Sequence, residues 1–394
     1  MEKKIKIAIV YHYLAHYREP VFRELCSAVE NNIEYTIVSG KYSNIKSIKT
    51  IEPKKALDNI NDGGLNWRFI KNYWLTKDVL WQSGVIKLVW KKEFDGVIFL
   101  GNMYYLSTWI AIIVAKFRGV HTFLWTHGFR SDEKGMKGWT RSIFYKLSDS
   151  ILLYGQRARS IMTGKGFDVG SIYVINNSLD YDKQCSVRNE LTSEKLKEYK
   201  EKYFDNPDWP VLITTGRLID SKKIDYLVKA VTVLKGKGTD VNLMIIGDGP
   251  LKEKIKKMVV ENNIANRVVL YGACYNEDEL GPMISMADIC VVPDALGLAC
   301  VHSLVYGTPV ITHNQFDYHG PEAEAIKDGV NGCLYEYGDF SDLVIKIEVW
   351  LKQDRSRDEI KQICQSVVDN YYTPRYQKTM IGKAINEQLS KADV

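Results

Sequence analysis

The sequence predicts an α/β protein made of two doubly wound domains, each built around a parallel sheet. Apolar strand-like runs alternate with helix-like segments from end to end, which is typical of parallel sheets covered by helices. A chain of 394 residues is too long for one ordinary core and suits two domains. A polar, highly charged stretch over residues 177–210 separates the two alternating halves.

In the first half, short apolar runs end at glycine or at polar residues, as buried parallel strands do. Gly119 is the expected C-cap of one helix, and residues 130–138 read as a charged loop. We expect strands at 6–11, 35–39, 96–100, 122–125, 150–154 and 173–175, and helices at 20–29, 105–117 and 156–164.

The second half repeats this alternation, and no shorter internal period is present. The last helical region is interrupted around Pro374. We expect strands at 211–215, 242–246, 268–271, 289–292 and 309–312, and helices at 225–235, at 251–261 and from the Gly297-Leu298 turn to just before Gly307.

The composition argues against a disulfide-rich, metal-binding or membrane-spanning protein. The 7 cysteines are scattered, without a C-x-x-C pair or clustering with histidine, which argues for reduced thiols in a cytoplasmic protein and against a disulfide framework or a metal site. The lysine-rich N-terminus does not read as a signal peptide, and the longest apolar run, 106–115, is too short to span a membrane.

The charge is divided unevenly between the halves. Residues 1–180 carry 26 lysines and arginines against 16 acidic residues, whereas the remainder is acidic. Trp74, Trp81 and Trp90 lie among these lysines, a mixture that suits contact with an anionic membrane surface. Solvated lysines on exposed faces explain the charge equally well, and no nucleic-acid-binding motif is present.

The most informative stretch runs from Asp294 to Pro309. A strand ending at Val292 is followed by a Gly297-Leu298 turn and an apolar helix that stops at Gly307. Free backbone N–H groups at such a turn face any anion or sugar above it. Asp294 before the turn and His302 one helical turn inside the helix bracket the expected site.

This stretch resembles the donor-binding signature of the retaining, GT-B fold glycosyltransferases of family 4, in which two glutamates are separated by seven residues. Here the spacing and Gly297-Leu298 are kept, but Asp294 and His302 replace the glutamates. The resemblance implies that Asp294 binds donor sugar hydroxyls and that His302 takes the place of the ribose-binding glutamate. On that basis, His302→Glu should keep or improve nucleotide affinity.

A second glycine turn follows the first strand of the second half. Gly216-Arg217 with Lys222 five residues later suits a diphosphate, because Arg offers a planar fork and Lys a point charge; solvated charges on a turn are the alternative. The family's Gly-Arg-Leu-x3-Lys-Gly pattern matches except that Lys223 replaces the last glycine. The resemblance implies that Arg217 and Lys222 hold and stabilise the leaving diphosphate.

Three other segments carry candidate residues. The turn with Gly247 and Gly249 either helps to frame the donor site, as in the family, or is a packing turn. His127, before Gly128 at the end of a strand, either matches a family histidine that hydrogen-bonds the transferred sugar or is a structural histidine. His16, Tyr17 and Arg18 either bind a phosphate-bearing acceptor or merely lead into a helix.

The resemblance implies a GT-B fold of two Rossmann-like domains with a cleft between them. We expect an acceptor domain (1–180), a linker with a charged helix (181–210), a nucleotide-sugar domain (211–370) and a helix (371–394) that crosses back to the first domain. Residues 312–324 follow the last strand of the site, and no role is assigned to them.

The expected activity is transfer of a sugar, with retention, from a nucleotide-diphosphate sugar to a glycan or lipid-linked acceptor, without cofactor or metal. The family implies a setting in bacterial surface polysaccharide assembly, in the cytoplasm or on the inner face of the membrane. Two alternatives remain: a GT-B-type nucleotide-sugar epimerase, and an inactive sugar-nucleotide-binding protein. Intact Arg217, Lys222 and Gly297-Leu298 speak against the inactive protein.

Overall fold

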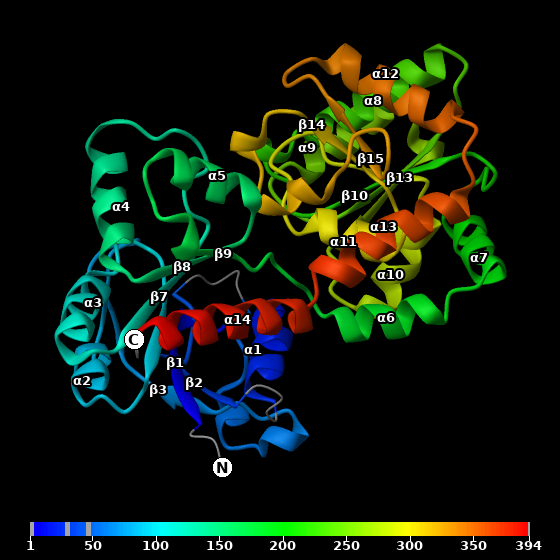
Figure 1. The fold of residues 1–394 in the computed structure, drawn as a ribbon. Coiled ribbons are helices and arrows are strands. Elements are labelled where there is room, and N and C mark those ends of the chain that lie inside the picture. Colours follow the sequence, from blue (N-terminus) through cyan, green and yellow to red (C-terminus); the bar gives the residue numbers. More distant parts are fainter. Residues whose placement is uncertain (1–3, 28–31, 45–48, 393–394) are drawn as a thin grey trace. The chain divides into compact units, whose positions relative to one another are not determined.

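The computed structural model describes residues 4–27, 32–44 and 49–392, which form two compact units (Figure 1). Unit 1 comprises Met1–Asp180 together with Pro374–Val394, and unit 2 comprises Tyr181–Thr373. Each unit is built on a parallel sheet covered by helices, so the predicted α/β class with two doubly wound sheets is confirmed. The end of the predicted helix at 20–29, and the first three residues of the chain, lie outside the described residues.

Unit 1 contains a sheet of seven strands that all run parallel, in the order β3-β2-β1-β6-β7-β8-β9. The apolar strands form because both faces of the sheet are covered: Ile7 and Ile9 of β1 face one core, and Ala8 and Val10 face the other. The strands are β1 (Ile5–Tyr13), β2 (Ile33–Gly40), β3 (Trp67–Phe69), β6 (Gly96–Leu100), β7 (His121–Thr126), β8 (Ser150–Leu153) and β9 (Ile172–Val174).

The helices of unit 1 follow these strands in the crossover pattern. Gly119, with φ of 62°, ends the third helix as its left-handed C-cap, as predicted. The segments are η1 (His16–Arg18), α1 (Glu19–Cys26), η2 (Pro53–Ala56), η3 (Ile60–Asp62), the antiparallel pair β4 (Asn72–Trp74) and β5 (Leu80–Gln82), α2 (Val85–Trp90), α3 (Leu106–Arg118), α4 (Gly135–Leu147), α5 (Gln156–Gly164) and η4 (Val169–Ser171).

The C-terminal helix α14 (Pro374–Ala392) packs within unit 1, beside α1 and β9 (Figure 1). Ile381, Ala384 and Ile385 are fully buried in the same core as β1. Tyr173 of β9 donates to Glu387 at 2.8 Å, and Ser178 donates to Gln377 at 2.6 Å. These contacts make a segment from the end of the chain part of the first unit's core.

Unit 2 contains a second parallel sheet, in the order β12-β11-β10-β13-β14-β15. Its central strands are buried and apolar, which explains why the sequence predicted them closely. The strands are β10 (Val211–Thr215), β11 (Asn242–Ile246), β12 (Val268–Gly272), β13 (Ile289–Val291), β14 (Val310–His313) and β15 (Gly332–Tyr335).

The helices of unit 2 bury apolar faces against this sheet; in α8, for example, Leu227, Val231 and Leu234 are completely buried. The helical segments are α6 (Tyr181–Asn189), α7 (Ser193–Tyr203), η5 (Asp220–Lys222), α8 (Ile224–Gly236), α9 (Lys252–Glu261), η6 (Ala265–Arg267), α10 (Glu277–Met286), α11 (Ala299–Val305), η7 (Phe316–Tyr318), η8 (Pro321–Ala325), α12 (Phe340–Lys352) and α13 (Arg357–Tyr371).

Several segments differ from the sequence-based expectation. Residues 181–210, expected as a linker with one charged helix, contain α6 and α7 and cluster with unit 2. The charged loop predicted at 130–138 gives way to α4 at Gly135. α10 was not predicted, and it contains Pro282 in its interior. No helix among the described residues is both long enough and apolar enough to cross a bilayer.

Strand order changes direction at one point in each sheet, between β1 and β6 in unit 1 and between β10 and β13 in unit 2. The loops at the carboxyl ends of such neighbouring strands diverge, leaving room for a ligand. The predicted residues Gly216, Arg217 and Asp294 follow β10 and β13, and His16 to Arg18 follow β1. The topology therefore places these candidates where open parallel sheets bind ligands.

Candidate functional site

The glycine turns after β10 and β11 are packed against each other at the carboxyl edge of the unit 2 sheet. The N–H of Gly216 donates to Ile246 O at 2.9 Å, and the N–H of Leu218 donates to Asp248 O at 3.0 Å. A Cβ atom at Gly247 would lie 1.8 Å from the carbonyl oxygen of Gly216, and one at Gly249 would lie 2.5 Å from that of Leu218. Both glycines are therefore required for the two backbones to approach.

Arg217 and Lys222 bring two positive charges to this edge. The ammonium of Lys222 donates to the carbonyl oxygen of Ala295, which ties the β10 loop to the β13 loop. Burial and the nearby charge of Arg217 lower the pKa of Lys222, and Asp294 opposes them. Arg217 is exposed; its backbone carbonyl accepts the N–H of Ile219 at 3.0 Å, while its guanidinium makes no hydrogen bond or ion pair with another described residue. Two neighbouring cations, of which only Lys222 is offset by Asp294, form a site that favours an anion.

The β13 loop holds Asp294 in a fixed position. Its Oδ1 accepts the N–H of Ala295 at 2.7 Å and faces Nε2 of His313 at 3.3 Å. Ala295 has a φ of 45°, a conformation that the Asp294 contact helps to hold. Gly297 and Leu298 follow and lead into α11, as predicted. The side chain of Asp294 remains 14% exposed, so one oxygen can reach a ligand.

Two histidines support this loop from β14 and the residues after it. Nδ1 of His319 accepts the N–H of Leu296 at 3.1 Å, and its Nε2–H donates to His313 O at 2.9 Å. The two imidazole rings stack with centroids 3.9 Å apart. Sequence reasoning assigned no role to either histidine, although their place directly after a strand of the site was a usable signal.

The hydrogen bonds of His319 require the neutral ring, which leads to a prediction for pH. Burial lowers the pKa of His319 to about 4, although the hydrogen bond to the backbone of His313 opposes this shift. Because the folded-state pKa lies below the ordinary 6.5, the unfolded chain binds the proton first. Neutral His319 therefore contributes up to about 3 kcal/mol to the free energy of unfolding above pH 6.5. This contribution is lost as the pH falls from 6.5 toward 4.

Urea unfolding of the intact chain across this pH range measures the effect. His319→Asn keeps an acceptor for Leu296 N–H but cannot titrate, so its stability curve should be flatter in acid. A variant curve as steep as that of the wild type would contradict the assignment.

His302 does not stand alone on α11. Its Nε2 lies 2.8 Å from Oε1 of Glu277 at the start of α10, and the hydroxyl of Tyr306 donates to the same oxygen at 2.7 Å. Burial raises the pKa of Glu277, but the hydrogen bonds from His302 and Tyr306 outweigh it and hold that pKa below 4.5. The carboxylate is therefore ionised and pairs with His302. Sequence reasoning did not find Glu277, which lies 25 residues away.

In unit 1, His127 lies at the end of β7, and Gly128 follows with φ of 65°. The residue is exposed, but its ring lies 4.7 Å from that of Tyr154. Although part of the residue meets solvent, the side chains packed around the ring remove water from it, and this desolvation, followed by the charges of Arg130 and Arg18, lowers the pKa of His127 to about 4. The ring is thus neutral near pH 7 and is able to donate to or accept from a sugar hydroxyl.

The loop after β1 separates the three residues predicted for the acceptor. Tyr17 is exposed, and His16 is exposed near Lys49 O. Arg18, by contrast, is only 5% exposed and donates to Asn177 Oδ1 at 2.8 Å. Its guanidinium carbon lies 4.7 Å from the centroid of the Trp125 ring and 5.6 Å from that of Tyr154. Arg18 is therefore held by aromatic rings instead of projecting from the loop.

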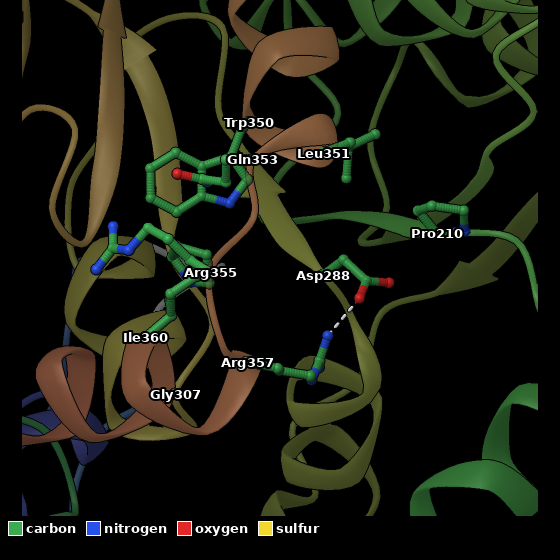
Figure 2. A pocket seen from close by; sticks show the side chains of 10 residues that line it. Pro210, Asp288, Gly307, Trp350, Leu351, Gln353, Arg355, Arg357 and Ile360 are labelled. Carbon is green, nitrogen blue, oxygen red and sulfur yellow. Dashed lines mark hydrogen bonds and ion pairs between the residues drawn. The ribbon is translucent and has the colours of Figure 1, made fainter.

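A small hollow of about 140 Å³ lies at the opposite, amino edge of the unit 2 sheet (Figure 2). Arg357 pairs with Asp288 there and donates to the carbonyl oxygens of Ser285 and Ala287. Arg355 donates to Gly329 O and Val330 O. The contacts of these two arginines attach the start of α13 to the sheet. Because both cations are already paired and the hollow is smaller than ordinary ligand pockets, we do not take it as the candidate site.

Comparison with known sequences finds relatives for the second half of the chain. Residues 196–366 match the model of the family described as "Glycosyl transferases group 1", and this range includes every candidate residue of unit 2. The chain is 27% identical over 146 residues to alpha-D-kanosaminyltransferase of Streptomyces kanamyceticus, covering 36% of each chain. It is 26% identical over 192 residues to the lipopolysaccharide core biosynthesis glycosyltransferase LpsE of Rhizobium meliloti, covering 48% of this chain and 50% of LpsE.

The chain thus spans half or less of the length of these curated relatives. Among solved structures, Anabaena HepE in complex with UDP superposes with a TM-score of 0.69 over 98% of this chain and 100% of that chain, at 15% identity. At that identity the likeness shows the fold, which is the predicted GT-B class. The comparisons identify residues 196–366 as a region similar to group 1 glycosyl transferases.

Proposed function

We propose that this chain is a glycosyltransferase that moves a sugar, with retention, from a nucleotide-diphosphate sugar to a glycan or lipid-linked glycan. The observation that carries the proposal is the convergence of Arg217 and Lys222 beside the Asp294 loop, at the switch point of the unit 2 sheet. Two cations near one carboxylate suit a ligand with a diphosphate at one end and hydroxyl groups at the other. The match of residues 196–366 to group 1 glycosyl transferases supports the same reading.

The proposed chemistry needs no cofactor and no protein nucleophile. The acceptor hydroxyl attacks the anomeric carbon on the face from which the diphosphate leaves, and the departing phosphate oxygen takes the hydroxyl proton. Lys222 and Arg217 stabilise the charge that develops on the diphosphate, so catalysis rests on position and electrostatics. Gly216, Gly247 and Gly249 let the backbone come close to the nucleotide.

Asp294 is proposed to accept hydrogen bonds from the donor sugar, and Asp294→Asn tests this role. Asparagine can still accept the N–H of Ala295, so we expect the thermal stability to change little. A neutral amide is a weaker acceptor than a carboxylate, so kcat/KM should fall about tenfold or more. Asp220→Asn, an exposed residue on the same edge, is the matched control. An unchanged kcat/KM in Asp294→Asn would contradict the assignment.

Unit 1 is proposed to supply the acceptor side. His127, neutral near pH 7, is placed to hydrogen-bond a sugar hydroxyl. At the carboxyl ends of β2 and β3, a pocket of about 450 Å³ is lined by Lys41, Lys71, Phe69 and Trp74. Aromatic faces stack on sugars and lysines attract phosphate, so this pocket suits an acceptor that carries both. The proposed setting is surface polysaccharide assembly on the cytoplasmic face of a membrane.

Calorimetric titration with UDP, GDP and TDP and the corresponding monophosphates tests the donor site. One diphosphate should bind, its monophosphate should bind more weakly, and the difference should shrink in Arg217→Ala, because Arg217 faces the second phosphate in this proposal. Proton NMR of donor, acceptor and product then decides the reaction. A transferred sugar with the donor's anomeric configuration supports retention, whereas a changed free nucleotide sugar without acceptor would identify an epimerase.

A further inference from the structure

Helix α3 carries an exposed apolar stripe that no other part of the described chain covers. Leu106, Ile110, Ile113 and Phe117 are 42%, 42%, 43% and 85% exposed, respectively. Their spacing of three or four residues places them on one face of the helix, over about 16 Å. An ordinary surface helix presents polar residues to solvent, so a continuous apolar outer face indicates a surface that binds another molecule or a membrane.

The surroundings of the stripe are basic. Residues 96–131, which include all of α3, contain no aspartate or glutamate, and neither do residues 79–92, which include α2. Helices α2 and α3 lie side by side (Figure 1). Lys87, Lys91, Lys92 and Lys116 are exposed. The nearby Glu93 is already paired with Arg68 and Lys91, and Asp95 and Asp149 line a hollow together with Lys92 and Lys116, so Lys87 is the cation here with no acidic neighbour described.

The C-terminal ends of the two helices combine apolar and charged groups. Trp90 of α2 is 59% exposed, and the guanidinium carbon of Arg118 lies 5.2 Å from the centroid of its ring. Phe117 is the most exposed residue of the stripe and lies next to Arg118. An exposed indole and phenyl ring with adjacent cations match the interface of a bilayer, where the rings enter the headgroup layer and the cations meet lipid phosphate.

From these observations we infer that the α2–α3 surface, defined as Trp90, Leu106, Ile110, Ile113 and Phe117 with the flanking lysines, docks on an anionic lipid bilayer. The positive charge of this surface favours an anionic bilayer over a second copy of the chain as its partner. A symmetric self-contact would bring the same cations of both copies together, whereas anionic lipid neutralises them. Trp74 and Trp81, which the sequence grouped with Trp90, are half-buried and do not belong to this surface.

The inference goes beyond the proposed sugar transfer, and its test needs neither donor nor acceptor, so the two can fail separately. The intact protein is sedimented with vesicles of phosphatidylglycerol and phosphatidylcholine, and with vesicles of phosphatidylcholine alone. We expect binding to the anionic vesicles that weakens with added salt. Ile113→Glu with Phe117→Glu should lower the partition coefficient about tenfold or more.

The matched control is Ile345→Glu with Val349→Glu on α12, two apolar residues with the same spacing and exposures of 49% and 59%. This variant should bind vesicles as the wild type does, and both variants should keep the circular dichroism of the wild type. Absence of wild-type binding, or equal binding by the α3 variant, would overturn the inference. A wild-type dimer that the α3 variant converts to monomer would assign the surface to a second copy and would also overturn it.

Discussion

Lys222→Ala is expected to lower kcat by about 100- to 1,000-fold, because a cation placed against a developing negative charge contributes about 3–4 kcal/mol to the transition state. In the structure, Lys222 shares this position with Arg217, but only Lys222 also bonds to the Asp294 loop through Ala295 O. Its removal should therefore affect the chemical step more than the binding of nucleotide. Steady-state release of nucleoside diphosphate at saturating donor measures the change.

The neighbouring residue gives a matched control. Lys223→Ala removes the same charge one position away, from an exposed side chain, and should leave kcat close to that of the wild type. Thermal unfolding of both variants checks that the β10 loop is intact. If kcat of Lys222→Ala stays within about tenfold of the wild type, the leaving-group role is wrong, because a stabiliser of this kind contributes more than that factor.

His302→Glu is expected to destabilise the protein by about 2–4 kcal/mol near neutral pH. The substitution places a second carboxylate where Nε2 of His302 now lies, 2.8 Å from Glu277. The side chains are 16% and 18% exposed, so solvent screens the repulsion only in part. The resemblance predicts that glutamate at this position would keep or improve nucleotide affinity, and the pairing with Glu277 adds a separate cost to the stability of the fold.

The direction of the pH dependence provides a check. Two close carboxyl groups share a proton, which raises the pKa of one of them, so the loss in His302→Glu should shrink in mild acid. In the wild type, the pKa of Glu277 is held below its ordinary value of 4.5. The ionised Glu277 therefore stabilises the fold above pH 4.5, and this stabilisation is lost as the pH falls below that value.

The charge-swapped double variant, Glu277→His with His302→Glu, should restore most of the lost stability because it re-forms the pair in reverse. Urea unfolding of the single and double variants measures the coupling. A double variant no more stable than His302→Glu would show that the pair is not the cause of the loss.

The strands could be predicted from sequence where both faces of the sheet are covered. β6, β10 and β11 have the predicted bounds, because fully buried parallel strands are continuous apolar runs that end at glycine or proline. The segment between β2 and α2 could not be predicted. Its strands are short and partly exposed, so burial imposes no clear period on them.

The candidate site likewise contains residues that could be predicted from the sequence and contacts that could not. Arg217, Lys222 and Asp294 could be found because each follows a strand or glycine turn at a fixed spacing. The partners of these residues could not, since the contacts of His319 with Leu296 and of Glu277 with His302 join loops from different strands and helices. Arg18 was a candidate acceptor ligand, but the rings that enclose it come from β7 and from the residue after β8, which its local sequence does not reveal.

The most direct test is release of nucleoside diphosphate from a panel of UDP-, GDP- and TDP-sugars, measured with and without lipid-linked and free glycan acceptors. We expect release from one donor, stimulated by an acceptor, and loss of that release in Lys222→Ala but not in Lys223→Ala. Acceptor-independent conversion of a donor, or tight donor binding with no release across the whole acceptor panel, would contradict sugar transfer as the function of this site.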